Sequence, residues 1–258
     1  MASELRTRTI VGLGLIALAA GALIFGGFFF WMLLAIAGVL MQGEWGDLTG
    51  APREHRQLAM YAVSVPLAIL CPLAAGVSWL GFALTMAAFF FTLLAGRSLK
   101  LALGIFYICV PVMALLYLRG QQPDGHGLLL AFWALGLVWA TDIGAYFAGR
   151  SIGGPKLAPR ISPSKTWSGL GGGVLAALLT GFLLYRFADL PIQLAAASGL
   201  LAVAAQLGDL LESAMKRRAG VKDSGKLLPG HGGVMDRLDG VVAAAPLAAL
   251  LYLVLAGA

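Results

Sequence analysis

Long apolar runs recur along the whole chain of 258 residues, and polar residues gather between them. A helix needs about 20 apolar residues to cross the roughly 30 Å of hydrocarbon in a bilayer. The pattern therefore predicts an all-α, polytopic integral membrane protein with about nine transmembrane helices. The nine expected spans are residues 9–25, 28–41, 57–74, 78–95, 99–118, 127–148, 167–187, 192–212 and 240–256.

The first two spans are separated by a pair of glycines. Residues 9–41 would form a helix of about 50 Å if they were continuous, which is too long for a single crossing. Gly26 and Gly27 offer a break. The second piece is short, so a helical hairpin and a tilted, partly re-entrant helix are both compatible with the pattern.

Composition supports this fold class. Apolar residues make up 60% of the chain, charged residues 12%, and the mean hydropathy is +0.88, which excludes an ordinary soluble domain. Arg6 and Arg8 precede the first apolar run as in a signal peptide, but further runs follow, so we expect a retained first helix or hairpin. Cys71 and Cys109 stand alone in apolar segments, which argues against a zinc site or a disulfide framework.

The distribution of basic residues predicts the orientation. With the N-terminus in the cytoplasm, sixteen of the eighteen Lys and Arg residues fall on the cytoplasmic side, and only Arg119 and Arg186 fall outside. This asymmetry favours nine spans with the C-terminus outside. Both long polar loops, residues 149–166 and 213–239, would then lie in the cytoplasm, where nucleotides are available.

Charge is concentrated between residues 206 and 240, and burying charge near hydrocarbon costs several kcal/mol per group. The segment holds five of the twelve acids and six of the eighteen bases. We therefore expect the chemistry to reside there. The charged residues are Asp209, Glu212, Lys216, Arg217, Arg218, Lys222, Asp223, Lys226, Asp236, Arg237 and Asp239.

Two acids fall within or at the edge of apolar spans, where an acid is a functional candidate by default. Asp142 shares a helical face with Tyr146 and Gly149; the alternative is a helix-end acid paired with a nearby base. Asp209 belongs to a polar stripe of Gln206, Ser213 and Lys216, which must face protein or water rather than lipid. A purely structural polar seam between helices remains the alternative for this stripe.

The second long loop contains a glycine-rich turn at residues 228–233, which could bend sharply and expose N–H groups to an anion. Taken alone this signal is weak, and His231 could simply be a turn residue. Asp236 and Asp239 follow at the start of the last helix, a position where the helix dipole favours carboxylates even without a metal.

The first long loop is expected to end at a helix start, with Ser162 as N-cap and Pro163 at the first helical position. A helix N-terminus flanked by Lys165 and Thr166 could bind an anion. The alternative is a capped helix with solvated bases. Together the two loops supply bases for phosphate and carboxylates for a hard divalent cation, which suits magnesium far better than zinc.

These motifs resemble the signature of the phosphatidate cytidylyltransferase family, also called CDP-diglyceride synthetases. The match covers the C-terminal half from about Trp139, and one departure is Ser168, where the family usually has a glutamate. The matching motifs are Trp139-x-x-Asp142-x-x-Ala145-Tyr146-x-x-Gly149, Ile161-Ser162-Pro163-x-Lys165-Thr166, Ser213-x-x-Lys216-Arg217, Lys222-Asp223 and Pro229-Gly230-His231-Gly232-Gly233-x-x-Asp236-Arg237-x-Asp239.

The resemblance implies transfer of CMP from CTP to phosphatidic acid, giving CDP-diacylglycerol and pyrophosphate, with Mg²⁺ required and a monovalent cation such as K⁺ left open beside it. It implies metal ligands at Asp209, Asp236 and Asp239. Catalytic roles fall to Asp209, Asp236, Lys216, Lys222, His231 and Arg237. Substrate binding falls to Ser162, Lys165, Thr166, Ser213, Arg217, Asp142 and Tyr146.

Hydropathy, the distribution of basic residues and, for the homodimer, the resemblance lead to further expectations for the whole chain. We expect residues 1–120 to hold about five N-terminal spans, and residues 121–258 to form a catalytic domain with its signature motif at 213–239. The expected partners are the two substrates, the bilayer and a second copy of the chain in a homodimer, with no nucleic acid polymer. The expected location is a bacterial inner (plasma) membrane, with the N-terminus and the active-site loops in the cytoplasm.

Three rival functions fit the sequence less well. A CDP-alcohol phosphotransferase would need a later acid after Asp239-Gly240, and none follows. An ion-coupled transporter would explain Asp142 and Asp209 as ion sites, but it would not require the basic loops. A membrane scaffold explains the hydropathy but not the charge cluster.

Overall fold

The computed structural model describes residues 2–122, 125–228 and 230–255, with side chains from residue 9 onward. The chain forms two compact units. The first comprises Met1–Gly120 and Arg218–Leu238, and the second comprises Gln121–Arg217 and Asp239–Ala258. The long loop before the last helix therefore belongs with the N-terminal helices.

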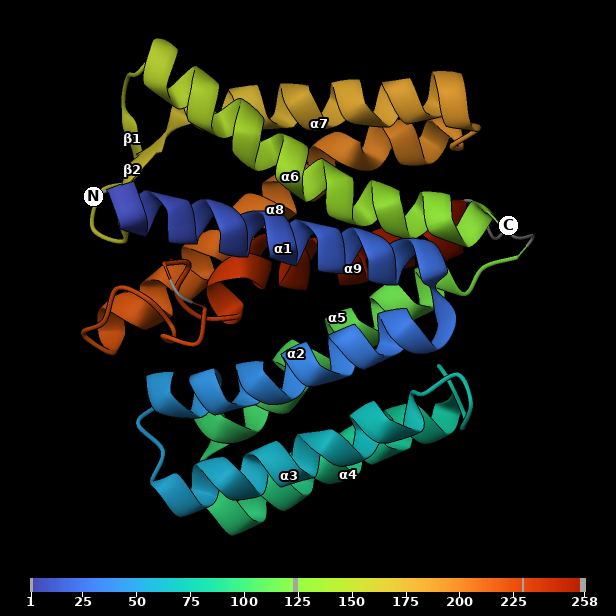
Figure 1. Cartoon of the computed structure of the whole chain (residues 1–258), viewed down its shortest axis with the longest axis vertical. Helices are drawn as coiled ribbons and strands as arrows, with labels where there is room; N and C mark the ends of the chain where they lie inside the picture. Colours follow the sequence, from blue (N-terminus) through green and yellow to red (C-terminus); the bar gives the residue numbers. More distant parts are fainter. Residues whose placement is uncertain (1, 123–124, 229, 256–258) are drawn as a thin grey trace. The chain divides into compact units, whose positions relative to one another are not determined.

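Helices make up most of the described residues (Figure 1). Their bounds are α1 Ala2–Phe25, α2 Gly27–Leu48, α3 Arg53–Ile69, α4 Trp79–Gly96, α5 Leu99–Arg119, α6 His126–Ser151, α7 Trp167–Ala188, α8 Ile192–Arg218 and α9 Met235–Leu255. Two short strands, β1 Lys156–Ala158 and β2 Ser162–Thr166, lie between α6 and α7.

Seven of these helices are long and apolar enough to cross a membrane: α2 and α4 to α9. The chain is thus a multi-pass membrane protein. The apolar part of α1, Thr9–Phe25, and the 17 residues of α3 are shorter. Nine crossings remain a prediction.

The break between the first two spans occurs at the predicted glycines. Gly26 and Gly27 have φ angles of 62° and 46°, a region in which residues with a Cβ are strained. The Arg119 side chain then satisfies carbonyls at the end of α1, donating from Nε to Leu23 O at 2.8 Å and from a terminal nitrogen to Ile24 O at 3.0 Å. The second span proved longer than expected, because α2 continues to Leu48.

In the first unit, α2 packs against α3 and α5, and α4 packs against both α3 and α5 (Figure 1). Two tryptophans of α2 fix it to these partners. Trp31 Nε1 donates to Leu67 O at 2.7 Å, and Trp45 Nε1 donates to Lys100 O at 2.8 Å. Helix α2 is therefore held to α3 and α5 by hydrogen bonds as well as by apolar burial.

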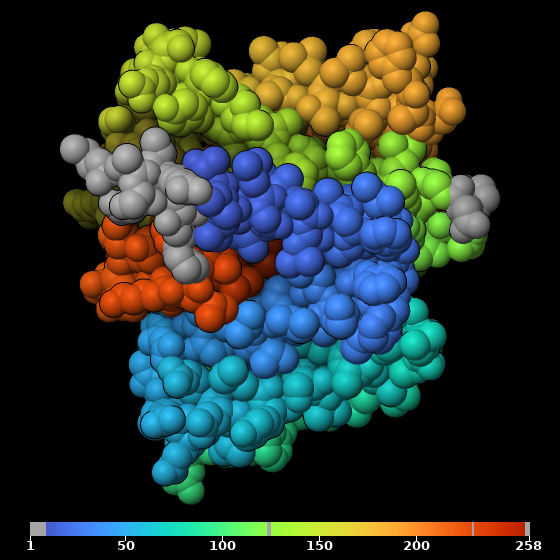
Figure 2. Space-filling view, in the orientation of Figure 1, coloured from blue at the N-terminus to red at the C-terminus, as the bar shows by residue number. Residues whose placement is uncertain are grey.

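Large apolar side chains cover the exposed faces of the helices. In α1, Ile10, Leu13 and Ile16 are each more than half exposed, and Figure 2 shows this dark-blue segment at the surface. In a soluble protein such a surface would invite aggregation, whereas hydrocarbon solvates it without cost. The exposed faces are those expected of helices that contact lipid.

The second unit is a bundle of α6, α7, α8 and most of α9. Trp133 of α6 is fully buried and donates from Nε1 to Ser198 Oγ of α8 at 2.9 Å. Glycines allow close approach elsewhere: a Cβ at Gly208 of α8 would lie 2.9 Å from the Ala243 Cβ of α9.

The all-α prediction was incomplete, because the loop after α6 forms a β-hairpin. β1 and β2 pair antiparallel, with Lys156 opposite Thr166 and Ala158 opposite Ser162. The predicted helix start at Ser162 and Pro163 was therefore wrong. Helix α7 begins at Trp167, and Thr166 is its N-cap, since its Oγ1 accepts from Gly169 N at 3.0 Å. Strand pairing holds Ser162 and Pro163 extended, which overrides their local signal.

Helices α6 and α7 are in close contact along a glycine-rich seam. A Cβ at Gly144 would lie 2.6 Å from both the Ala176 Cβ and Gly172 O, and one at Gly172 would lie 2.9 Å from Gly144 O and still closer to the Ala148 Cβ. Neighbouring Gly171 has nothing within 4 Å of its Cβ position. Gly171 and Gly172 are thus neighbours in the same helix, but only Gly172 is packed closely against α6.

We therefore expect Gly172→Ala to destabilise the protein by about 1–3 kcal/mol through overpacking. The apparent unfolding temperature in detergent would fall by roughly 2–10 °C. Gly171→Ala is the matched control, and it should be neutral or slightly stabilising because alanine favours a helix by about 1 kcal/mol over glycine. Equal unfolding temperatures for the two variants would contradict the close packing of α6 on α7.

Candidate active site

The second unit contains an open pocket of about 330 Å³ at the hairpin end of its bundle. Four elements line it, one of them the start of α7 with Gly169 and Leu170. Helix α6 contributes Asp142, Tyr146 and Gly149, the hairpin contributes Lys165 and its neighbours, and α8 contributes Gln206 and Asp209. The volume lies at the lower end of the range for small-molecule sites, and the lining is polar and charged.

An ion pair between Lys165 and Asp209 crosses this pocket. Lys165 Nζ lies 2.6 Å from Asp209 Oδ2, a contact of charges rather than an aligned hydrogen bond. The Lys165 side chain is 15% exposed and that of Asp209 is 28% exposed, so water only partly screens their attraction. Ser213 donates to the other carboxylate oxygen of Asp209 at 3.2 Å. The pair therefore joins the hairpin to α8 within the second unit.

The α6 wall of the pocket carries a second acid. Asp142 is exposed, and Gln206 Nε2 lies 3.5 Å from its Oδ1, at the limit of a hydrogen bond. Tyr146, one turn further on, accepts a hydrogen bond from Arg150 at 3.2 Å through its hydroxyl. The face of α6 predicted from the spacing of Asp142, Tyr146 and Gly149 is the face that lines the pocket.

Small residues bring the hairpin close to α6. A Cβ at Gly149 would lie 3.0 Å from Thr166 Oγ1, and one at Gly169 would lie 3.0 Å from Ala145 O. Ser168 stands where the resemblance described above leads to the expectation of a glutamate. Its hydroxyl lies 3.0 Å from Thr166 Oγ1 and donates to Gly153 O, so it ties the loop to the helix start.

Other charged residues of the second unit make polar contacts on α8, at the hairpin and at α9. Glu212 is fully buried, and its Oε1 accepts from Lys216 Nζ at 3.1 Å. Asp239 accepts from Gly240 N at 2.7 Å and lies close enough to Asp209 for their charges to interact. Arg217 Nε donates to Ile161 O at 3.4 Å, which connects α8 to the hairpin.

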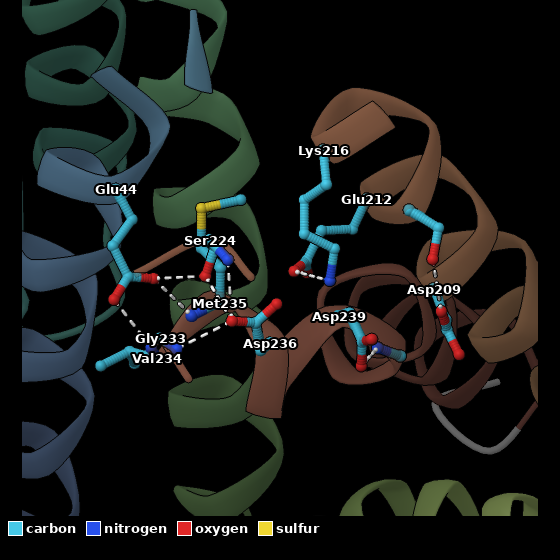
Figure 3. Close-up of polar contacts among 12 residues, drawn as sticks. Glu44, Asp209, Glu212, Lys216, Ser224, Gly233, Val234, Met235, Asp236 and Asp239 are labelled. Atoms are coloured by element: carbon cyan, nitrogen blue, oxygen red, sulfur yellow. Dashed lines mark hydrogen bonds and ion pairs between the residues drawn. The ribbon is translucent and has the colours of Figure 1, made fainter. Parts of the chain in front are cut away.

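In the first unit, the Asp236 carboxylate is held by the loop that precedes it (Figure 3). Its Oδ2 accepts from Ser224 N at 2.9 Å and from Gly233 N at 2.7 Å, and Ser224 Oγ lies 3.0 Å away. Hydrogen bonds to an ionised acceptor contribute about 1.5–3 kcal/mol each. Asp236 is therefore fixed in one orientation at the start of α9.

Sequence reasoning missed a buried acid, Glu44 of α2, which belongs to the same network. Its carboxylate is directed at the start of α9 (Figure 3), where Oε1 accepts from Val234 N at 2.8 Å and Oε2 from Met235 N at 2.9 Å. Ser224 Oγ lies 2.9 Å from Oε2. Glu44 lies beyond the expected span of residues 28–41, so the argument from acids within apolar spans that pointed to Asp142 did not include it.

The rest of this loop makes a tight turn. Leu228 N donates to Gly232 O at 2.9 Å, and His231 N donates to Leu228 O at 2.8 Å. Gly230 and Gly232 have positive φ angles of 75° and 83°, which glycine adopts without strain. The His231 ring lies against Gly12 of α1. Pro229, part of the signature motif, lies outside the described residues.

The predicted site residues thus fall into three groups. The second unit gathers Asp142, Tyr146, Lys165, Thr166 and Asp209 at the pocket, and it places Ser213, Lys216 and Asp239 close to Asp209. The first unit places Asp236 in the Glu44 network. Ser162 is partly buried in β2, whereas Arg217, Lys222 and Arg237 are exposed.

Among the described residues, no group of three or more His, Cys, Asp or Glu side chains is close enough to hold a metal ion. Mg²⁺ is usually bound by one or two carboxylates, with substrate phosphates and water completing the shell. The carboxylates near the pocket are hard oxygen ligands of the kind that Mg²⁺ takes. The donor chemistry therefore fits magnesium, although a preassembled cluster of three does not occur.

A model of the cytidylyltransferase family matches residues 6–255. The chain belongs to this family. The match includes the N-terminal helices, where sequence inspection had detected only hydropathy.

Curated relatives extend this result. A phosphatidate cytidylyltransferase of Brucella suis biovar 1 (strain 1330) is 40% identical over 257 residues, which covers 97% of this chain and 93% of the relative. That of Pseudomonas aeruginosa PAO1 is 37% identical over 269 residues, covering 96% and 97%. That of Bacillus subtilis (strain 168) is 47% identical over 143 residues, covering 54% and 52%.

Proposed function

We propose that this cytidylyltransferase acts on a lipid: it transfers CMP from CTP to phosphatidic acid and releases pyrophosphate, forming CDP-diacylglycerol for phospholipid biosynthesis. The observation that carries the proposal is the charged pocket that joins Lys165, Asp209 and Asp142 in a multi-pass membrane protein. The names of the relatives support the same substrates.

Charge repulsion is the main barrier to this reaction. The attacking phosphate is largely ionised at pH 7, since its second pKa is about 6, so it needs little deprotonation. Both the nucleophile and the triphosphate are polyanions, and fixed cations must bring them into line. Lys165, Lys216, Arg217, Lys222 and Arg237 would bind phosphates, while Ser162, Thr166, Ser213 and His231 would orient them.

The Lys165–Asp209 ion pair is the state of the pocket before substrate binds. In the protein alone, each side chain neutralises the other at 2.6 Å. A triphosphate entering the pocket would offer Lys165 a partner of greater charge. Release of Asp209 would then leave its carboxylate available on the wall of the pocket, held by Ser213.

Magnesium is the cofactor we propose, with Asp209 and Asp236 as its protein ligands and Asp239 as a further candidate. Asp142 would line the substrate site. When bound, the metal would reduce the repulsion between the two polyanions and stabilise the departing pyrophosphate. A monovalent cation such as K⁺ could accompany it.

The decisive test is turnover by the purified protein in detergent with labelled CTP, magnesium and phosphatidic acid. We expect wild type to form CDP-lipid, and we expect Asp236→Asn to reduce kcat by about 100-fold or more, as loss of a group that stabilises transition-state charge does. Glu54→Gln, which removes an exposed acid of α3, is the control and should retain wild-type turnover. The proposal fails if wild type makes no CDP-lipid or if Asp236→Asn turns over normally.

We also propose that the protein lies in the inner membrane of a bacterium and that it forms a homodimer. Light scattering in detergent can test the homodimer.

We further propose that both long loops face the cytoplasm. This orientation can be tested with single cysteines in a background without Cys71 and Cys109. A membrane-impermeant maleimide should label Ala74→Cys in intact spheroplasts, but Lys226→Cys only after permeabilisation. Both positions are exposed. Labelling of Lys226→Cys in intact spheroplasts would contradict the orientation.

A further inference from the structure

The buried acid of α2 and the signature acid of α9 are anchored by the same short segments of chain. Glu44 accepts from Ser224, Val234 and Met235, and Asp236 accepts from Ser224 and Gly233 (Figure 3). We propose that Glu44 is a positioning residue for Asp236. The inference rests on the proposed function, in which Asp236 contacts the metal, and it assigns a role to the N-terminal helices.

Ser224 links the two carboxylates directly. Its hydroxyl oxygen lies 2.9 Å from Glu44 Oε2 and 3.0 Å from Asp236 Oδ2, and the residue is only 6% exposed. A hydroxyl carries one proton, so it donates to one carboxylate at a time. Any displacement of Glu44 therefore changes how the Ser224 hydroxyl proton is shared with Asp236.

The start of α9 provides the second link. The first backbone N–H groups of a helix have no partner within the helix, and a polar side chain at the N-cap usually accepts from one of them. Here Val234 precedes the helix, and its side chain has no acceptor. Glu44 supplies the acceptors from α2 instead, and it takes the N–H groups of Val234 and Met235. The position of the first turn of α9, which carries Asp236, thus depends on a side chain 190 residues earlier.

The loop backbone is closely packed onto the Glu44 carboxylate. A Cβ at Gly225 would lie 2.7 Å from Glu44 Oε1, and a Cβ at Gly233 would lie 2.5 Å from Oε2. Both glycines therefore leave room for this acid. A simple helix cap would not require a buried carboxylate from another helix. It would also not require a loop that packs around that carboxylate on both sides. The arrangement fixes the donors of Asp236, namely Ser224 and Gly233, against α2.

The test measures metal binding rather than turnover, with Mn²⁺ as the probe. Free Mn²⁺ is counted by electron paramagnetic resonance during titration of purified protein in detergent. Loss of a group that orients a metal ligand typically weakens affinity 10–100-fold. We expect Glu44→Gln and Ser224→Ala each to weaken Mn²⁺ binding at least 10-fold, because the glutamine amide would turn an N–H group toward a backbone N–H group, and alanine removes the shared hydroxyl.

Two controls match these variants. Ser198→Ala removes another buried serine hydroxyl, which accepts from Trp133 far along the chain from Asp236, and Glu54→Gln removes an exposed acid. Both should bind Mn²⁺ as wild type does. Ser224→Ala keeps the bonds from Glu44 to α9 and removes a direct contact of Asp236, so it tests the shared hydroxyl alone. If Glu44→Gln fails to fold, Glu44→Asp, whose shorter side chain withdraws from Val234 and Met235, takes its place.

A double-mutant cycle separates positioning from general damage. If Glu44 acts through Asp236, then Glu44→Gln should weaken Mn²⁺ binding little further in an Asp236→Asn background. Additive losses would overturn the inference, as would wild-type affinity in both Glu44→Gln and Ser224→Ala, or a wild-type protein that binds no Mn²⁺. Because the readout is binding, a protein that binds Mn²⁺ in this pattern yet makes no CDP-lipid would refute the proposed function and leave the inference standing.

Discussion

Ionised side chains inside a helix bundle in a membrane must be held by partners, because lipid offers them none. This constraint organises both units of the protein. In the second unit Lys165 neutralises Asp209, and Lys216 accompanies the fully buried Glu212. In the first unit, Glu44 and Asp236 accept hydrogen bonds from backbone N–H groups and from one serine hydroxyl. The way each acid is held indicates how it can respond to a substrate.

The two kinds of partner have different chemical consequences. A lysine held by an aspartate can exchange that partner for a phosphate, so the Lys165–Asp209 pair suits a pocket that must open to a polyanion. Backbone amides cannot leave in this way, so the Asp236 carboxylate stays in one orientation. We interpret the Lys165–Asp209 pair of the second unit as exchangeable and substrate-facing, and the Glu44 network of the first unit as a rigid support for Asp236.

Much of this arrangement follows from the sequence, and the remainder has identifiable physical causes. The spacing and length of the apolar runs located the helices. Gly26 and Gly27 marked a true break between the first two, because only glycine adopts their φ angles easily. The spacing of Asp142, Tyr146 and Gly149 identified the pocket face of α6. The hairpin at residues 156–166 was missed, since Ser162-Pro163 has the local signal of a helix start and strand pairing overrides it. Glu44 was missed because its partners lie 180–191 residues away, beyond any spacing argument.

The central claim is that the pocket around Lys165 receives the triphosphate. The most direct measurement is equilibrium binding of CTP with magnesium, in the absence of phosphatidic acid, to wild type, Lys165→Met and Lys226→Met. Lys226 is exposed and lies outside the pocket, so its variant corrects for the general loss of one positive charge. Since the paired ammonium lies in a partly desolvated pocket, we predict that Lys165→Met binds CTP at least 10-fold more weakly, by about 1.4 kcal/mol, while Lys226→Met stays within about twofold of wild type. Equal affinities for all three proteins would contradict the account.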